Sequence, residues 1–245
     1  MPFAVELSVA IAAVRRAAEV CSNVQRAIPA AMEKQDKSPV TIADFASQAV
    51  ICRALGGAFS NDQIIGEEDS AELRLPENKP SLDGVESELS RIGVNGSPDE
   101  ICRWIDRGGA KSFGPRFWTL DPIDGTKGFL RGEQYAVSLA LIVDGQIEVA
   151  ILGCPNLPLV PNGDPASGSL FIAVRGQGAS VLPCFVGSGG FGSAFNVADL
   201  DPLAYRASRD RRKDSRRRYR ESRKRYRGSD LGKTRRRLSH RRFPY

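Results

Sequence analysis

The sequence predicts an α+β fold in which packed helices accompany a mixed or largely antiparallel sheet. Two segments before residue 60 carry apolar residues at helical spacing. Beyond residue 116, short apolar segments alternate with glycine-containing turns, which is typical of antiparallel strands. Helices come first along the chain and a series of strands follows, which is the order typical of an α+β fold.

Two helices are expected near the N-terminus. The first covers residues 5–28, and Pro29 ends it because proline cannot continue a helix. Its apolar residues recur every three or four positions: Leu7, Ile11, Val14, Ala18 and Cys21. The second helix begins at Thr41 and ends at residues 56–57, which are both glycine. Asp44 follows Thr41 by three residues, so the residue pattern alone favours an acidic capping-box partner.

Most strands are expected in the second half of the chain. The expected strands cover residues 62–66, 117–120, 136–143, 147–154, 170–174 and 179–182. Asp144-Gly145 should form the hairpin turn between two of them, since this pair favours tight turns between strands. Residues 75–116 are rich in glycine, proline, serine and charge, so we expect a partly ordered segment with one short helix at 98–105.

The composition indicates a globular protein that does not span a membrane. The chain of 245 residues is 41% apolar, which is enough to bury a core, and contains no apolar run near the length of about 18 that a span needs. Charged residues interrupt its N-terminal segment, which argues against a signal peptide and makes the cytoplasm the expected location. The five cysteines form no Cys-x-x-Cys pair, so we expect reduced thiols.

The distribution of histidine restricts the chemistry. The only histidine is His240, close to the C-terminus. The body of the chain therefore offers no imidazole for base catalysis or zinc binding. Any reaction there must use carboxylates, hydroxyls, lysines and hard metal ions.

Charge divides the chain into two unlike parts. Residues 203–245 hold 19 of the 35 Lys and Arg residues but only 4 of the 29 Asp and Glu residues, so this segment carries +15 and the rest carries −9. The basic segment has almost no apolar periodicity and cannot form a core. We therefore expect a folded domain at 1–185, a join rich in Gly and Ser at 186–202, and a disordered tail at 203–245.

An acidic motif follows the expected strand at 117–120. Asp121 and Asp124 lie three residues apart, and Pro122 stiffens the chain between them. Gly125-Thr126 comes next, where a tight turn could open a helix and present backbone N–H groups to an anion. Two carboxylates facing such donors suit a divalent cation shared with a phosphate. The alternative is an ordinary turn with an Asx cap.

A second acidic group, Glu67-Glu68-Asp69, follows the expected strand at 62–66. Three adjacent acids at the end of a strand repel one another unless a positive charge lies there. The residues alone leave two interpretations: a solvated, acidic helix start, or a cluster of metal ligands.

Three ordered motifs together resemble the magnesium-dependent, lithium-sensitive phosphatases of the inositol monophosphatase superfamily. The motifs are Lys-Ser-Pro-Val-Thr-Ile-Ala-Asp at 37–44, Ile-Gly-Glu-Glu-Asp at 65–69, and Trp-Thr-Leu-Asp-Pro-Ile-Asp-Gly-Thr-Lys-Gly-Phe-Leu-Arg at 118–131. Within the superfamily, Lys-Gly-Phe-Leu-Arg-Gly at 127–132, Gln-Tyr-Ala-Val at 134–137 and Gly-Cys-Pro-Asn at 153–156 resemble the 3′(2′),5′-bisphosphate nucleotidase branch. The resemblance extends to about residue 182 and implies the layered α/β sandwich of the sugar phosphatases, represented here by its N-terminal domain.

The resemblance implies roles for individual residues. It makes the Mg²⁺ ligands Glu67, Asp121, Asp124 and the carbonyl of Ile123, for two or three ions. It also makes Asp44 and Thr126 the groups that orient and deprotonate the attacking water, which replaces the capping role inferred for Asp44 from the pattern. The amides of Gly125 and Thr126, with Lys127, would bind the substrate phosphate. Glu68 would be a neighbouring acid or simply solvated.

The same resemblance implies a substrate. The expected reaction removes the 3′-phosphate of 3′-phosphoadenosine 5′-phosphate to give AMP, as part of sulfur assimilation. The close alternative is an inositol (poly)phosphate 1-phosphatase, which shares the metal motif. The expected protein is a monomer with a small-molecule substrate and no membrane partner.

The resemblance stops near Cys184. Family members continue with a second domain that supplies a further aspartate in a Trp-Asp motif, and no such motif follows here. We therefore expect impaired activity. The basic tail leaves two interpretations: an arm that binds nucleic acid or an acidic partner without catalysis, or out-of-frame or intron-derived sequence that is no functional module.

Overall fold

The computed structural model describes residues 2–28, 38–159 and 167–185. The expected join at 186–202 and the tail at 203–245 lie outside the described residues. The helices are α1 (Ala4–Ala27), α2 (Ser38–Ala58), α3 (Lys79–Arg91), α4 (Pro98–Asp106) and α5 (Thr126–Leu130), with short 3-10 helices η1 (Glu72–Arg74) and η2 (Pro76–Asn78). The strands are β1 (Gln63–Ile65), β2 (Arg116–Asp124), β3 (Ala136–Val143), β4 (Gln146–Cys154), β5 (Ser169–Val174) and β6 (Gly178–Pro183).

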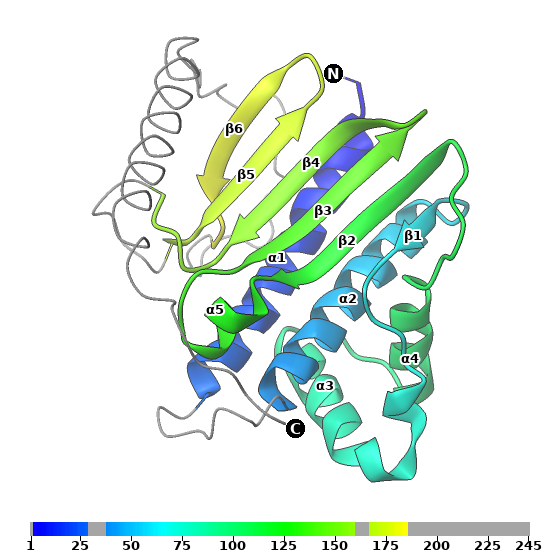
Figure 1. The fold of residues 1–245 in the computed structure, drawn as a ribbon, viewed down its shortest axis with the longest axis vertical. Coiled ribbons are helices and arrows are strands. Elements are labelled where there is room, and N and C mark those ends of the chain that lie inside the picture. Colours follow the sequence, from blue (N-terminus) through cyan, green and yellow to red (C-terminus); the bar gives the residue numbers. More distant parts are fainter. Residues whose placement is uncertain (1, 29–37, 160–166, 186–245) are drawn as a thin grey trace, which may run out of the picture. The chain divides into compact units, whose positions relative to one another are not determined.

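The strands form one six-stranded mixed sheet in the order β1-β2-β3-β4-β5-β6 (Figure 1). β1 runs parallel to β2, and every other neighbouring pair is antiparallel. The turn between β3 and β4 has positive φ angles at Asp144 (50°) and Gly145 (74°), the conformation that tight hairpins require. The α+β class, the mixed sheet and this hairpin are confirmed.

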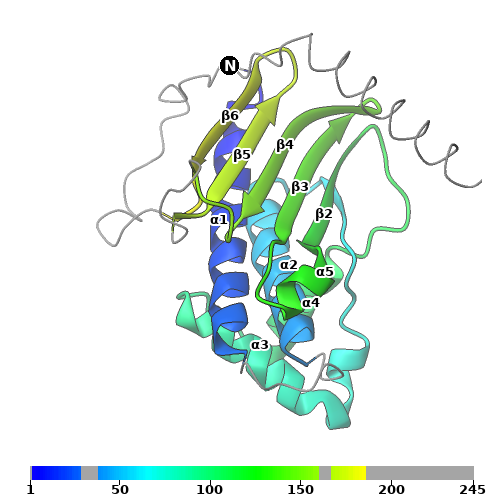
Figure 2. The same ribbon diagram turned by 60° about the vertical axis from the view of Figure 1, so that its left-hand side comes forward.

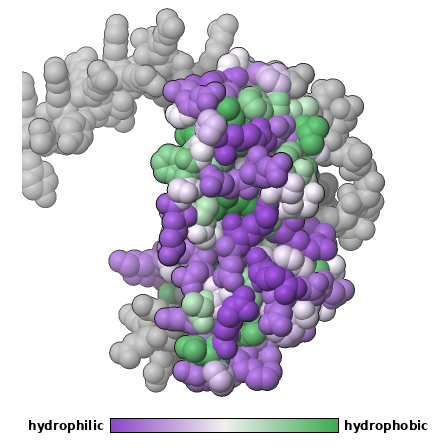
Figure 3. Space-filling view, turned by 90° about the vertical axis from the view of Figure 1, so that its right-hand side faces the viewer, coloured by the Kyte–Doolittle hydropathy of each residue, from purple (hydrophilic) through white to green (hydrophobic). Residues whose placement is uncertain are grey.

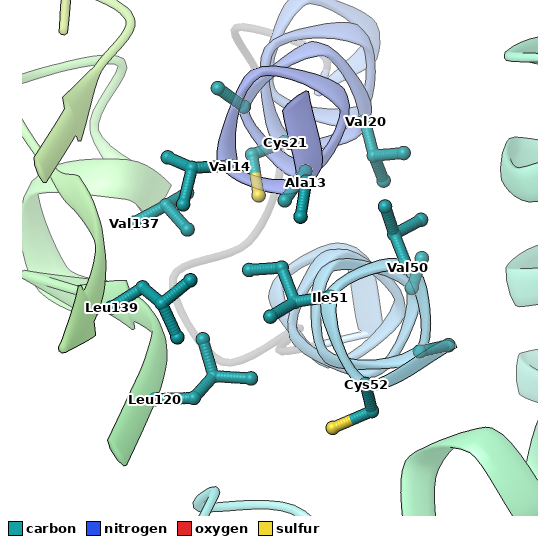
Figure 4. Packing of buried hydrophobic residues seen from close by; sticks show 14 of the residues in the cluster. Ala13, Val14, Val20, Cys21, Val50, Ile51, Cys52, Leu120, Val137 and Leu139 are labelled. Carbon is teal, nitrogen blue, oxygen red and sulfur yellow. The ribbon is translucent and has the colours of Figure 1, made fainter. Parts of the chain in front are cut away.

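Helices α1 and α2 cover one face of the sheet (Figures 1 and 2). Between them and the sheet lies the core, where Val14 and Ile51 of the helices point toward Leu120, Val137 and Leu139 of the strands (Figure 4). These five side chains are almost wholly buried. Full burial of an aliphatic side chain of this size stabilises a fold by roughly 1.5–3 kcal/mol, so this layer is a main source of stability.

No described helix covers the second face of the sheet, apart from the short α5 at one end (Figures 1 and 2). Because side chains alternate along a strand, this face carries Thr119 and Asp121 of β2 and Ala140 of β3. Leu152 and Phe171 pair across β4 and β5 on it and are 42% and 38% exposed. By contrast, the surface on the right-hand side of Figure 1 is mainly hydrophilic, with hydrophobic side chains in small scattered groups (Figure 3).

The segment at 75–116 is more regular than we expected. The short helix near 98–105 is confirmed as α4, which begins with a complete capping box between Ser97 and Glu100. The sequence did not predict α3, because only Val85 and Leu89 of its thirteen residues are buried. Both α3 and α4 pack against α2.

Two expected element boundaries are wrong. Helix α2 begins at Ser38, not Thr41, because proline is well tolerated in a first helical turn and Pro39 does not delay the start. Thr41 is therefore inside the helix, and Asp44 is not its capping-box partner. Strand β2 continues to Asp124 and does not end near residue 120, since a register shift between Asp121 and Asp124 accommodates Pro122, which cannot donate a hydrogen bond.

Two further findings concern the cysteines and the lengths of the helices. All five cysteines are free, and Cys21, Cys52, Cys102 and Cys184 are buried. Among the described helices, none is long and apolar enough to cross a bilayer.

Candidate active site

Three acidic segments meet near the end of β2. Asp44 lies on the second turn of α2, Glu67 and Glu68 follow β1, and Asp121 lies on β2. Because β1 and β2 are parallel neighbours, with Ile65 opposite Thr119, the chain leaves both strands at the same edge of the sheet. Helix α2 packs against β2 from the covered face. The fold therefore gathers carboxylates that are up to 77 residues apart in sequence.

The electrostatics of the site show mutual repulsion. Burial, followed by Glu68, Glu67 and Asp121, raises the pKa of Asp44 to about 8. Burial and the neighbouring acids Glu67, Asp69 and Asp121 raise the pKa of Glu68. Every charged side chain that shifts these two pKa values is acidic. A cation at this point would relieve the repulsion and lower both values.

Asp121 gives a second sign of a missing positive partner. Burial, Glu67 and Asp124 raise the pKa of its carboxyl, although a hydrogen bond from the backbone of Ile123 lowers it. Its Oδ1 atom is buried and has no hydrogen-bond partner. Leaving a carboxylate oxygen buried and unpaired costs free energy, and a hard cation that prefers oxygen ligands would satisfy it.

The donor set fits Mg²⁺ in its chemistry but is not yet arranged as a closed site. Within the described part of the chain, no three Asp, Glu, Cys or His side chains lie close enough to share one ion. Holding a common ion therefore requires the carboxylates to turn toward one another. Asp124 is exposed and free to do so, whereas Asp121 is half-buried.

The turn after β2 carries the remaining predicted residues. Gly125 adopts φ 98°, a left-handed conformation that strains other residues, and α5 begins directly after it. The expected helix after this turn is therefore confirmed. The hydroxyl of Thr126 donates to the carbonyl of Ile123 at 3.4 Å, so a predicted base and a predicted ligand are in contact. Lys127 is exposed on the first turn of α5.

A shallow groove of about 350 Å³ adjoins the acidic residues. Glu67 and Asp121 line it together with residues of the uncovered sheet face, including Thr119, Ser138 and Leu152. The groove therefore connects two of the predicted metal ligands with open sheet surface. The catalytic, ligand and phosphate-binding roles of the individual residues stay predictions.

Two polar residues beside the cluster were not predicted from the sequence. Ser47 and Gln48 of α2 have no exposed surface. Ser47 donates to the carbonyl of Pro122 at 3.4 Å, and Gln48 makes three hydrogen bonds to backbone atoms, two of them at Glu68. The available signal is their position, because a Ser-Gln pair interrupts the buried side of an otherwise apolar helix.

Comparison with known proteins gives a consistent set of relatives. Residues 4–185 match the inositol monophosphatase family. The chain is 44% identical over 202 residues to 3′(2′),5′-bisphosphate nucleotidase 2 of Candida albicans, covering 73% of this chain and 55% of that protein. It is 41% identical over 200 residues to 3′(2′),5′-bisphosphate nucleotidase 1 of Arabidopsis thaliana, covering 73% and 56%. A solved inositol monophosphatase from Zymomonas mobilis has a TM-score of 0.46 at 20% identity, covering 75% of this chain and 52% of that one.

The chain spans about half the length of the curated relatives it matches. The three motifs at 37–44, 65–69 and 118–131 lie inside the residues that match the family, and the match covers well over half of the chain. The chain belongs to the inositol monophosphatase family.

Proposed function

We propose that this protein is a Mg²⁺-dependent phosphatase that removes the 3′-phosphate of 3′-phosphoadenosine 5′-phosphate and releases AMP. The observation that carries the proposal is the convergence of Asp44, Glu68 and Asp121, whose pKa values are all raised, first by burial and then by acidic neighbours. Relatives at 37–44% identity are named 3′(2′),5′-bisphosphate nucleotidase, which supports the choice of substrate.

The residues that would hold two or three Mg²⁺ ions are the carboxylates of Glu67, Asp121 and Asp124 and the carbonyl of Ile123. Bound Mg²⁺ would supply neutralisation of the phosphate charge and a water molecule of lowered pKa. The unpaired Oδ1 of Asp121 supports this assignment, since it is a ligand atom with no protein partner.

The remaining roles belong to groups of the chain itself. Asp44 would accept the proton of the attacking water, because a bound cation would lower the raised pKa of its carboxyl and leave it ionised at working pH. The Thr126 hydroxyl would orient that water. The first amides of α5 and the ammonium group of Lys127 would hold phosphate oxygens, since a helix start leaves N–H groups without partners in the helix.

The test is phosphate release by the purified chain with Mg²⁺. We expect hydrolysis of 3′-phosphoadenosine 5′-phosphate, inhibition by Li⁺, and slower release from AMP and from inositol 1,4-bisphosphate. Asp121→Asn should abolish activity. Asp144→Asn is the matched control, because Asp144 is an exposed turn residue with φ 50°, which asparagine tolerates.

Faster phosphate release from inositol 1,4-bisphosphate than from 3′-phosphoadenosine 5′-phosphate would favour the alternative function, an inositol (poly)phosphate 1-phosphatase. A folded chain that releases no phosphate from any of these compounds, or an Asp121→Asn variant as active as Asp144→Asn, would contradict the proposal. A monomeric state and a cytoplasmic location also stay proposals, which sedimentation and a fluorescent fusion would test.

A further inference from the structure

We propose that Gln48 is a positioning residue that fixes the backbone of the Glu67-Glu68 segment against α2, beside Asp44. The metal-binding consequence of this inference rests on the function proposed above. Gln48 touches none of the reacting groups through its own carboxamide. It acts through the backbone that carries two acidic side chains.

The hydrogen bonds of Gln48 are specific to this segment. Its Nε2 donates to the carbonyl of Glu68 at 2.5 Å and to the carbonyl of Ile105 at 2.9 Å. Its Oε1 accepts from the backbone N–H of Glu68 at 3.0 Å. Both polar atoms of the Gln48 side chain are thus hydrogen-bonded, and the carboxamide bonds both the N–H and the C=O of Glu68.

The position of Gln48 on α2 links this contact to the base. Asp44 and Gln48 are four residues apart, so they lie one above the other on the same face of the helix. A segment bonded to Gln48 must therefore lie close to Asp44. The raised pKa of Asp44, to which Glu68 is the largest charged contributor, agrees with this placement.

Two glycines leave space for the carboxamide. A Cβ atom at Gly66 or at Gly108 would overlap the side chain of Gln48. These glycines are also joined to each other, since the N–H of Gly66 donates to the carbonyl of Gly108 at 2.7 Å. The Gln48 side chain therefore occupies a fitted site between α2, the acidic segment and the end of α4.

Ser47, the residue before Gln48, contacts the backbone of the acidic segment at 121–124. Ser47 is wholly buried and bonds the carbonyl of Pro122, which lies between Asp121 and Asp124. Consecutive residues of α2 thus hold two acidic segments that are distant in sequence. Both contacts fix the backbone of an acidic segment against the helix that carries Asp44.

The test compares Gln48→Met with Ile51→Val. The Gln48→Met variant keeps the side-chain length but removes all three hydrogen bonds. The Ile51→Val control lies on the same helix, is wholly buried and contacts the sheet, so it weakens the core without touching the acidic segments. Hydrogen exchange of the metal-free proteins reports on the backbone of residues 66–69, and calorimetric titration with Mn²⁺ reports on affinity.

We expect Gln48→Met to speed exchange at the Glu68 amide at least about tenfold and to raise the Mn²⁺ Kd about 10- to 100-fold, the range known for residues that orient metal ligands. Ile51→Val should leave the exchange rate of the Glu68 amide and the Mn²⁺ Kd within about twofold of the wild-type values. Gly66→Ala, which displaces the carboxamide while Gln48 remains, should give the same changes if Gln48→Met does not fold.

Unchanged exchange at Glu68 in a folded Gln48→Met variant would overturn the inference. Faster exchange with an unchanged Mn²⁺ Kd would also overturn it, since Gln48 would then stabilise a loop without positioning ligands. If the wild-type chain binds no Mn²⁺, the proposed function fails, and the exchange result alone decides whether Gln48 holds the segment.

Discussion

Replacing Asp44 by asparagine should stabilise the metal-free protein while destroying its activity. Burial, and after it the neighbouring acids, disfavours the charged form of Asp44 in the folded chain. Asparagine has nearly the same shape and cannot ionise. The substitution therefore removes the electrostatic cost of folding and, at the same time, the proposed base.

The magnitude follows from the pKa of Asp44. Folding raises it from 3.8 to about 8, so the folded protein retains at pH 7 a proton that the unfolded chain has released. Each pKa unit corresponds to about 1.4 kcal/mol, and roughly three units separate 3.8 from pH 7, which gives an upper value of about 4 kcal/mol. Because the pKa is raised, wild-type stability is complete below pH 4 and falls as the pH rises toward 8. The Asp44→Asn variant should lack this fall.

The assay is urea denaturation at pH 5, 6, 7 and 8 in EDTA, with Asp144→Asn as the control. We expect Asp44→Asn to exceed wild type by about 2–4 kcal/mol at pH 7 and by less at pH 5. Saturating Mg²⁺ should reverse the order, since the ion pairs with the wild-type carboxylates. Equal stability of the two proteins at pH 7 without metal would refute the electrostatic argument.

Three further predictions concern other parts of the chain. Gly128→Ala should lower the free energy of unfolding by about 1–3 kcal/mol, because the new Cβ would meet the backbone of Gln134. Gly57→Ala should raise it by about 0.5–1 kcal/mol, because this position within α2 has open space for a Cβ. Thermal melts of the two variants would measure both effects. Asp62→Asn should lower the free energy of unfolding, measured by urea denaturation, by about 2–4 kcal/mol, since the Asp62 carboxylate accepts hydrogen bonds from Arg116 and Trp118. An unchanged free energy of unfolding would contradict this prediction. If residues 203–245 form a basic arm, the full chain should bind RNA with an affinity that falls steeply with salt, and deleting these residues should abolish that binding. Binding that does not depend on salt would exclude a basic arm.

Elements whose signals are local were predictable from the sequence. Helix α1 follows from its apolar spacing, and the β3–β4 hairpin follows from Asp144-Gly145 between two alternating segments. Helix α3 was missed because packing against α2, not a broad apolar stripe, holds it. The end of β2 was missed because a bulge, which depends on pairing with β3, absorbs Pro122.

The candidate site was only partly predictable, because some of its residues have local sequence signals and others depend on tertiary contacts. Asp121 and Asp124 lie only three residues apart in sequence, so their spacing indicates a site without tertiary information. The pattern around Asp44 favoured a cap, and only the family resemblance and the tertiary fold place it among acids. The local signal of Gln48 is only its place on the apolar side of a helix, since its hydrogen bonds depend on a loop twenty residues away.

The most direct test of the proposed metal site is a crystal structure of the chain soaked with Mn²⁺ and phosphate, with anomalous scattering used to locate the ion. We expect an anomalous peak bonded to the carboxylates of Asp121, Asp124 and Glu67, with phosphate oxygens completing the coordination near the start of α5. A fully occupied peak elsewhere, or no peak at saturating Mn²⁺ in a folded crystal, would contradict the claim that these acidic segments form a metal-dependent phosphatase site.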